Sequence, residues 1–371
     1  MSSHTPVQRL LLVAPNWLGD ALLATTLIRA VKAQRPQLHL AALAVPRAAE
    51  VLRGNPHVDE LIVYDERGSD RGWFAKHRLA RRLRRGAFDA ALLVRPSFSR
   101  AALLWWAGIP RRVGHAHRTK DWFLTELMPA PLSAEHRADG YLRLLAALDP
   151  PLAGARLGWP APQEALCEFF VQDRDRALVR QWLHAQGVMN DQRLIVLHPA
   201  GNWAHKRWPA ERFAALGDRL HEAHGAHIAH IAITGSDEDR AVAQRVQGAM
   251  RSEAILAAGE LTFQQLGALI ERADLIVVND SGPLHLAAAL QRPVLALFGP
   301  TSPAVTGPYH AARARVLHHS NCCPEIPCYR PDDPPHPGML SLTVDEVAQA
   351  ADEMLSQPQA TGNTQQAVRH G

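Results

Sequence analysis

Short apolar runs alternate with helical patterns along most of the chain. Each run has the length of a strand buried on both faces, and the segments between runs place apolar residues three or four positions apart, as helices do. The alternation predicts repeated βα units. The runs cover residues 9–15, 38–45, 60–65 and 88–96 in the first half, then 193–201, 227–235, 253–259, 274–280 and 293–300 in the second.

The two series of βα units predict two parallel sheets, each covered by helices on both faces. The fold class is therefore α/β, with two doubly wound, Rossmann-like domains. A Pro-rich segment at 148–164 separates the series. We predict an N-terminal domain over 1–175, a C-terminal domain over 176–342, an amphipathic helix over 343–356 and a polar, disordered tail over 357–371.

The composition fits this architecture, since 371 residues with 47% hydrophobic and 20% charged residues can bury two cores. No stretch approaches the roughly 18 apolar residues of a membrane span, and the N-terminus does not match a secretory signal. We therefore expect a cytoplasmic protein. The four cysteines are few and irregularly spaced, which predicts reduced thiols.

Basic residues concentrate between residues 71 and 120, which hold thirteen Lys and Arg against one acidic residue, Asp89. The run at 78–85 alone is typical of a solvated helix face. Other predicted elements add further cations, namely Arg95, Arg100, Arg111, Arg112, Arg118 and Lys120. Together they predict a patch for nucleic acid, a phospholipid surface or a phosphorylated substrate. The sequence does not rank these three, although it lacks the usual nucleic-acid-binding signatures.

The ends of the predicted strands carry the candidate chemistry, because ligands of open α/β sheets bind beyond the carboxyl ends of the strands. After the first strand, a five-residue loop leads to Gly19 and Asp20 at the opening of a helix. Asp20 could be an N-cap carboxylate, a common use of Asp at this position. It could equally serve as a general base, and the spacing permits both roles.

A second strand end is the stretch HPAGNWAHKRWP at 198–209. Gly201 and Asn202 allow a turn, and Lys206 stands close to the start of a helix. The unpaired amides of a helix N-terminus and a lysine ammonium both favour an anion such as phosphate. A lysine that only faces solvent is the ordinary alternative.

A third strand end lies in VVNDSGPLHLAAAL at 277–290. Its strand stops at Asp280, and a small turn at Ser281 and Gly282 offers amides that could receive a diphosphate. His285 follows on an otherwise apolar helix, where a buried core histidine is the common alternative.

Three widespread motifs are absent from the sequence. There is no GxGxxG after the first strand, no GxxxxGK[ST] and no GxSxG. Dinucleotide binding, P-loop hydrolysis and the α/β-hydrolase mechanism therefore lose their expected signatures, while nucleotide-sugar transfer remains open.

A cysteine-rich segment near the C-terminus raises the alternative of a zinc site. Cys322, Cys323, Cys328 and His336 supply suitable atoms, but adjacent cysteines and the distance to His336 do not match the usual pairing. We expect no bound metal and no cofactor.

Taken together, the three strand ends resemble the glycosyltransferase family 9 heptosyltransferases, and within them the heptosyltransferase II group. The matching stretches are LLVAPNWLGDALLATTLIRAVKAQRP, HPAGNWAHKRWPAERFAAL and DLIVVNDSGPLHLAAALQRPVLALFGPTSP. The resemblance covers nearly the whole chain up to the last helix. It implies a GT-B architecture of two facing domains, and inverting transfer of L-glycero-D-manno-heptose from ADP-heptose to the inner core of lipopolysaccharide without a tightly held metal.

The resemblance also implies roles for individual residues. Asp20 matches the catalytic base of the family. The donor-binding residues would be Asn202, Lys206, Glu238, Asp280, Ser281, Gly282 and His285. We place the acceptor at Gly19, Arg95, Arg118 and Lys120. Many relatives carry a further cysteine after the histidine of the cysteine-rich segment, whereas HPGML at 336–340 has none.

The implied acceptor is a phosphorylated, Kdo-bearing lipid A core at the cytoplasmic face of the inner membrane. The basic patch would attract it and hold the enzyme peripherally at that surface. Three alternative hypotheses remain. The protein could be a family member that uses another nucleotide sugar or a later core or O-chain acceptor, a noncatalytic nucleotide-sugar-binding protein, or a nucleic-acid-binding protein.

Overall fold

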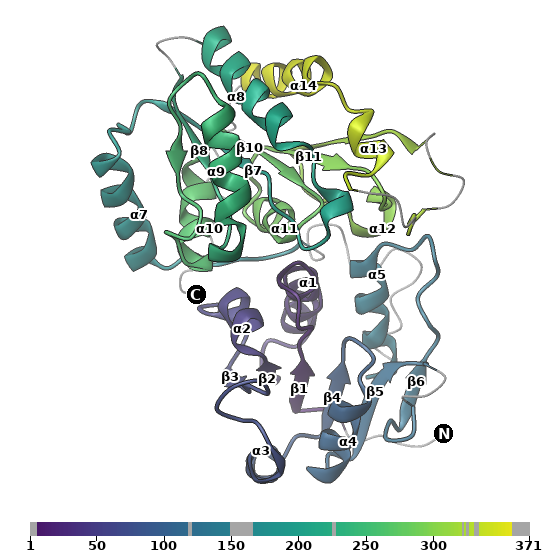
Figure 1. The fold of residues 1–371 in the computed structure, drawn as a ribbon. Coiled ribbons are helices and arrows are strands. Elements are labelled where there is room, and N and C mark those ends of the chain that lie inside the picture. Colours follow the sequence, from purple (N-terminus) through teal and green to yellow (C-terminus); the bar gives the residue numbers. More distant parts are fainter. Residues whose placement is uncertain are drawn as a thin grey trace.

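The computed structural model describes residues 6–117, 121–148, 166–224, 228–320, 323, 326–329 and 334–357. Two parallel sheets of six strands form two halves that face each other, and helix α1 lies between them (Figure 1). The first half contains β1 (Arg9–Val13), α1 (Leu18–Gln34), β2 (His39–Ala44), α2 (Pro46–Leu52), β3 (Glu60–Val63), α3 (Trp73–Arg85), β4 (Ala90–Leu93), α4 (Phe98–Trp106), β5 (Arg111–His115), β6 (Glu126–Met128), α5 (Arg137–Leu142) and η1 (Arg143–Ala147).

The second half begins with α7 (Asp173–Ala185). It continues with β7 (Arg193–His198), η2 (Ala204–Lys206), α8 (Ala210–His224), β8 (Ile228–Ile233), η4 (Asp237–Asp239), α9 (Arg240–Ala249), β9 (Ile255–Leu256), α10 (Phe263–Arg272), β10 (Leu275–Asn279), α11 (Gly282–Ala289), β11 (Val294–Phe298), α12 (Pro303–Thr306), β12 (Ala314–His318), α13 (Pro337–Leu340) and α14 (Val344–Ser356). Figure 1 shows α14 packed against α8 on the side of this half that is remote from the first sheet.

The first sheet has the strand order β3-β2-β1-β4-β5-β6, with every pair parallel. Successive residues of β1 pack on opposite faces, because side chains alternate along a strand. Leu10 and Leu12 join the core under α1, α2 and α5, whereas Leu11 and Val13 join the core under α3 and α4. Both faces are therefore covered, which is why the strands are continuous apolar runs.

The second sheet repeats this plan in the order β12-β11-β10-β7-β8-β9, again with parallel pairs. Leu194 and Val196 of β7 pack on the side of α10 and α11, and Ile195 and Leu197 pack on the side of α8, α9 and α14. In both sheets, the first three strands extend the sheet toward one edge, and the next three start again beside the first strand and extend it toward the other edge. These switch points lie between β1 and β4 and between β7 and β10, where ligands of such folds bind.

The two halves share one continuous apolar core in which α1 packs against α11. Polar contacts also cross between them. The side-chain amide of Gln264 donates to the carbonyl of Glu50 at 2.9 Å, and His136 Nε2 lies 3.2 Å from the carbonyl oxygen of Gly307. The GT-B arrangement predicted from the family resemblance, with two facing Rossmann-like sheets, is thus confirmed.

The nine predicted strand runs are confirmed as β1–β4 and β7–β11, but β5, β6 and β12 were not predicted. β5 starts with two arginines and β6 has only three residues, so neither presents an apolar run. β12 is an edge strand whose side chains are all partly exposed. Strands of this kind lack the periodicity on which the prediction depends.

The predicted helix over 343–356 is present as α14, capped by the hydroxyl of Thr343. The predicted domain boundary after residue 175 falls inside α7, and it remains a prediction. All of the predicted tail except residue 357 lies outside the described residues. Within the described part of the chain, no helix combines the length and the apolar character that a membrane crossing requires.

Candidate active site

The candidate site lies where the N-terminal ends of α1 and α11 meet, which brings the switch points of the two sheets together. Glycines make this approach possible. A Cβ atom on Gly19 would lie 2.7 Å from Cδ2 of His285, and a Cβ on Gly282 would lie 3.4 Å from Cβ of Leu18. Gly19 therefore acts as a close-packing residue between the halves, and its predicted contact with an acceptor stays a prediction.

Asp20 is buried in the first turn of α1, at the carboxyl end of β1. Its Oδ1 accepts a hydrogen bond from Nη1 of Arg137 at 2.7 Å. The N-cap position of α1 belongs to Trp17, whose side chain makes no capping bond. The N-cap alternative for Asp20 is therefore wrong, and its carboxylate is held by a cation of α5 instead.

The surroundings of Asp20 are electrostatically coupled. Burial lowers the pKa of Arg137, but the charge and hydrogen bond of Asp20, together with the nearby Tyr141 and Asp280, outweigh burial, so that this pKa lies above its ordinary value. Burial and the charge of Asp20 raise the pKa of Tyr141, while the charge of Arg95 opposes that rise. Arg95 is exposed just after β4 and lies close enough to act on Tyr141, but its predicted contact with an acceptor stays a prediction.

In the second half, an ion pair and a hydroxyl lie beyond the carboxyl ends of the strands, as Asp20 does in the first half. Asp280 follows β10, is buried, and its Oδ2 accepts from Lys206 Nζ and from Thr301 Oγ1, both at 2.7 Å. The three residues come from the loops that follow β7, β10 and β11. We call this group the anion anchor, because it fixes a lysine ammonium beside the N-terminus of α11.

Asn279 ties the loop after β7 to the end of β10. Its side-chain amide donates to the carbonyl of Pro199 at 2.9 Å, and its Oδ1 accepts from the backbone N–H of Trp208 at 3.1 Å. Asn279 is fully buried at the last position of β10. It clamps the loop before and after Lys206, so the position of the ammonium is set by the sheet.

The start of α11 provides a further polar group. Ser281 is the N-cap residue with an extended backbone, and Pro283 occupies the first turn. The hydroxyl oxygen of Ser281 is buried and has no hydrogen-bond partner among the described residues. Unpaired helix amides and a positive helix end favour an anion here, and the nearby Lys206 adds to that preference.

His285 lies between Asp20 and the anion anchor. Burial lowers its pKa to about 4, against the smaller opposing effects of the Asp280 and Asp20 charges, so the ring is neutral near pH 7. Its Nδ1 atom is buried without a hydrogen-bond partner in the described part of the chain. His285 is therefore not the satisfied core histidine that the sequence left as an alternative.

Not all predicted site residues come together. Asn202 is exposed on the loop after β7, and Glu238 is exposed within η4, which follows β8. Their predicted contacts with the donor remain predictions. Arg118 and Lys120 lie outside the described residues.

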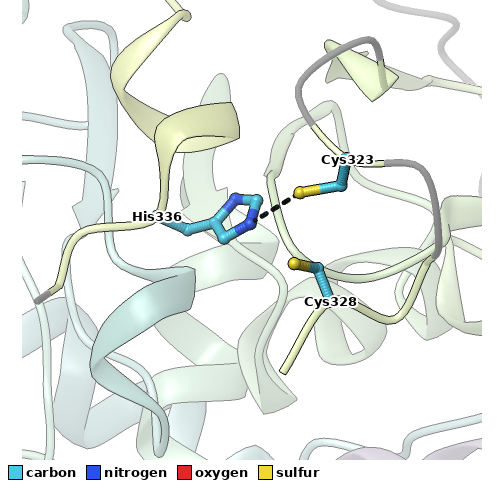
Figure 2. A group of neighbouring side chains, drawn as sticks. All are labelled: Cys323, Cys328 and His336. Atoms are coloured by element: carbon cyan, nitrogen blue, oxygen red, sulfur yellow. Dashed lines mark hydrogen bonds between the residues drawn. The ribbon is translucent and has the colours of Figure 1, made fainter. Parts of the chain in front are cut away.

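Three residues of the cysteine-rich segment do come together, although their spacing argued against a metal. Cys323, Cys328 and His336 place one potential ligand atom each within 4.8 Å of the others (Figure 2). Cys322 lies outside the described residues.

Comparison with known proteins identifies the family. The model of glycosyltransferase family 9 (heptosyltransferase) matches residues 76–331. Lipopolysaccharide heptosyltransferase 2 of Salmonella typhimurium is 29% identical over 83% of this chain and 87% of that protein, and its Escherichia coli counterpart is 25% identical over 95% and 100%. The solved structure of E. coli ADP-heptose lps heptosyltransferase II, 24% identical, superposes with a TM-score of 0.75 over 94% of this chain and 98% of that chain. The chain belongs to glycosyltransferase family 9, the heptosyltransferases.

Proposed function

We propose that this glycosyltransferase moves heptose from ADP-heptose to the inner core of lipopolysaccharide, with inversion at the anomeric carbon. The observation that supports this most is the meeting of Asp20 and the anion anchor across the α1–α11 contact. One half offers a base and the other offers a site for the leaving diphosphate. The proposal takes its substrates from relatives named as lipopolysaccharide heptosyltransferases.

Asp20 is placed to act as the general base. An acceptor hydroxyl would form a bond to the anomeric carbon from the face opposite the diphosphate, and its proton would pass to the Asp20 carboxylate. Arg137 holds that carboxylate through Oδ1, so its orientation is set before the acceptor arrives. A single base and in-line attack lead to inversion.

The leaving group is ADP, which takes the electron pair of the broken bond between the anomeric carbon and the β-phosphate oxygen. Lys206 has three N–H donors, of which one is engaged with Asp280, so the others can bind phosphate oxygens. The Ser281 hydroxyl and the amides at the start of α11 add neutral donors. Such preorganised groups can stabilise the developing charge without a metal ion at the diphosphate.

The acceptor would approach from the first half, past Arg95. Part of the basic patch is already paired there, since Arg78 contacts Asp70 and Arg82 contacts Glu60. The exposed cations that remain for an anionic partner include Arg71, Lys76, Arg81 and Arg85 on or before α3. A phosphorylated Kdo-lipid A core matches this charge.

Exposed aromatic rings lie next to these cations. Trp73 of α3 stacks on Trp106 of α4 with ring centroids 4.8 Å apart, and Trp105 and Phe98 of α4 both contact Phe123, at 5.4 and 5.3 Å. We call these five residues the aromatic ridge. Trp73, Trp105 and Phe98 are each more than half exposed, and Phe74 beside them is 87% exposed.

Aromatic rings and arginines on one surface are the combination that binds the interface of an anionic bilayer. Figure 1 places α3 and α4 at the end of the first half farthest from the second sheet. We propose that this surface holds the enzyme at the cytoplasmic face of the inner membrane, where a lipid-linked acceptor is found.

Vesicle binding tests the membrane surface. We expect Arg81→Ser with Arg85→Ser to weaken binding to phosphatidylglycerol vesicles by about thirtyfold, because each basic residue near an anionic surface contributes roughly a fivefold factor. Trp73→Ser with Phe74→Ser should weaken binding to the same vesicles at high salt as well. Sedimentation with vesicles measures both.

The control for this experiment is Leu178→Ser with Arg180→Ser, which removes an exposed leucine and an exposed arginine from α7 in the other half. Binding that drops equally in this control, or that is unchanged in both test variants, would reject the membrane surface.

The transfer reaction itself is tested by ADP release. With ADP-heptose and a core acceptor truncated before its second heptose, we expect ADP release that depends on the acceptor, and a product with an inverted anomeric centre by NMR. ADP release with a different nucleotide sugar or only with a longer core would favour the alternative donor or acceptor. Donor binding without release for any acceptor would favour a noncatalytic protein.

A further inference from the structure

Two thiols and an imidazole gather in the second half, in the segment between β12 and α13. Cys323 Sγ lies 3.1 Å from Nε2 of His336, and the ligand atoms of Cys323, Cys328 and His336 all lie within 4.8 Å of one another. Figure 2 shows the three side chains directed toward each other from separate stretches of backbone. Cys328 and His336 are buried and Cys323 is partly buried. We propose that they form a binding site for Zn²⁺.

The donor set and its spacing fit this ion. Two thiolates and one imidazole are ligands that Zn²⁺ prefers, with bonds of about 2.3 Å to sulfur and 2.0 Å to nitrogen. Two sulfurs and one nitrogen bound to one tetrahedral ion then lie about 3.5–3.8 Å apart. The Cys323–His336 distance of 3.1 Å is slightly below this range, and since no separation in the cluster exceeds 4.8 Å, the others need a contraction of at most about 1 Å. The described residues supply three ligands for the four positions of a tetrahedral site.

Binding of Zn²⁺ would change which atoms of the cluster carry protons. Nδ1 of His336 accepts from the N–H of Gly338 at 3.0 Å, so the neutral ring carries its proton on Nε2 and donates it to Cys323. When Zn²⁺ binds Nε2, that proton moves to Nδ1 and the Gly338 N–H gives up its acceptor. The two thiols release their protons to solvent. Three metal–ligand bonds then replace the hydrogen bonds of His336 with Cys323 and with Gly338.

The cysteine side of the cluster is tied to the anion anchor. The backbone N–H of Cys328 donates to the carbonyl of Pro300 at 2.8 Å. The next residue, Thr301, donates its hydroxyl to Asp280 at 2.7 Å. Fixing Cys328 therefore fixes the loop after β11 that completes the anion anchor.

The histidine side of the cluster is tied to the same anchor by a second route. The backbone N–H of His336 donates to the carbonyl of His205 at 3.3 Å, one residue before Lys206. The ring of Tyr329 also lies against Trp203, with centroids 5.6 Å apart. A bound ion would thus link the loop of Lys206 to the loop of Thr301. In this role, which rests on the proposed function, the ligands are positioning residues and do not touch the substrate.

Cobalt provides a direct test, since Co²⁺ bound by thiolates absorbs in the near ultraviolet and reports tetrahedral geometry in the visible. Full-length protein is treated with a chelator under reducing conditions and titrated with Co²⁺. We expect a thiolate-to-metal band that saturates at one ion per chain and disappears when Zn²⁺ is added. Cys328→Ser and Cys323→Ser should each weaken the band, and Cys167→Ala, which spares all three ligands, should keep it.

The absence of a thiolate band, or a band unchanged in both serine variants, would overturn the site. Cys323 is only partly buried, so Cys323→Ser gives an answer even if Cys328→Ser does not fold. The positioning role has a separate readout. Metal removal should lower kcat/KM for ADP-heptose by up to about a hundredfold, mainly through KM, and Zn²⁺ should restore it.

Unchanged kinetics in a protein that binds Co²⁺ would overturn the positioning role and leave the metal site standing. A Co²⁺ band in a protein that transfers no heptose would reject the proposed function without touching the site. The expectation of no bound metal, drawn from cysteine spacing, would be wrong if the band appears.

Discussion

Asp20→Asn is expected to lower kcat for acceptor-dependent ADP release by about 10² to 10⁴-fold, the usual contribution of a positioned general base. The amide has the size of the carboxylate and can still accept the hydrogen bond of Arg137, but it cannot take the proton of the acceptor hydroxyl. The KM for ADP-heptose should change little, because Asp20 lies in the first half and the anion anchor in the second. Steady-state kinetics with a truncated core acceptor measures both constants.

Asp173→Asn is the matched control, since Asp173 is almost fully exposed in the first turn of α7. It should retain the wild-type rate. A second variant, Arg137→Lys, separates the base from its support, because a lysine keeps the charge but not the planar fork of the guanidinium. A loss of less than about tenfold in Asp20→Asn, in a protein that remains folded, would remove Asp20 from the role of base.

The positions of Asp20 and Lys206 were predictable because both follow strands that are continuous apolar runs. Parallel strands buried on both faces are visible in sequence, and their carboxyl ends define one edge of each sheet. The resemblance of three ordered motifs to one family then predicted that the two edges face each other. Edge strands such as β12 escaped the same reasoning because their side chains are only partly buried.

The partners of these residues were not predictable in the same way. Arg137 contacts Asp20 across 117 positions, and Thr301 contacts Asp280 across 21. A hydrogen bond between residues so distant in sequence follows from the packing of α5 and of the loop after β11, and no local pattern encodes it. The role of Asn279 could have been predicted from the sequence, because a polar residue that ends a buried strand needs hydrogen-bond partners for its side-chain amide.

The cysteine cluster was not predictable from the spacing of its residues either. Spacing rules for zinc ligands describe compact local motifs, in which the chain turns once between pairs. Here His336 is fixed by its place as the N-cap of α13 and Cys328 by its bond to Pro300. Separate tertiary contacts bring the ligands together, so the distance along the chain was not informative.

Lys206→Ala is expected to lower kcat/KM for ADP-heptose by about 10² to 10³-fold, the scale for removing one preorganised donor from a developing negative charge. The same change leaves the buried Asp280 with Thr301 as its remaining side-chain partner in the described residues, at a cost in stability of about 3 kcal/mol or less. Kinetics must therefore be measured together with denaturant unfolding. Lys206→Arg, which keeps the positive charge, should lose less activity than Lys206→Ala.

The double variant Lys206→Met with Asp280→Asn distinguishes the two possible reasons for that loss. It removes both charges of the pair and should fold more stably than Lys206→Ala, because no uncompensated carboxylate stays buried. If Lys206 binds the leaving diphosphate, the double variant stays about as inactive as Lys206→Ala. If Lys206 serves only to neutralise Asp280, removing both charges restores much of the activity. The Lys206 side chain is partly exposed while that of Asp280 is almost fully buried, so the lysine is the partner that a ligand can reach, and we expect the first result.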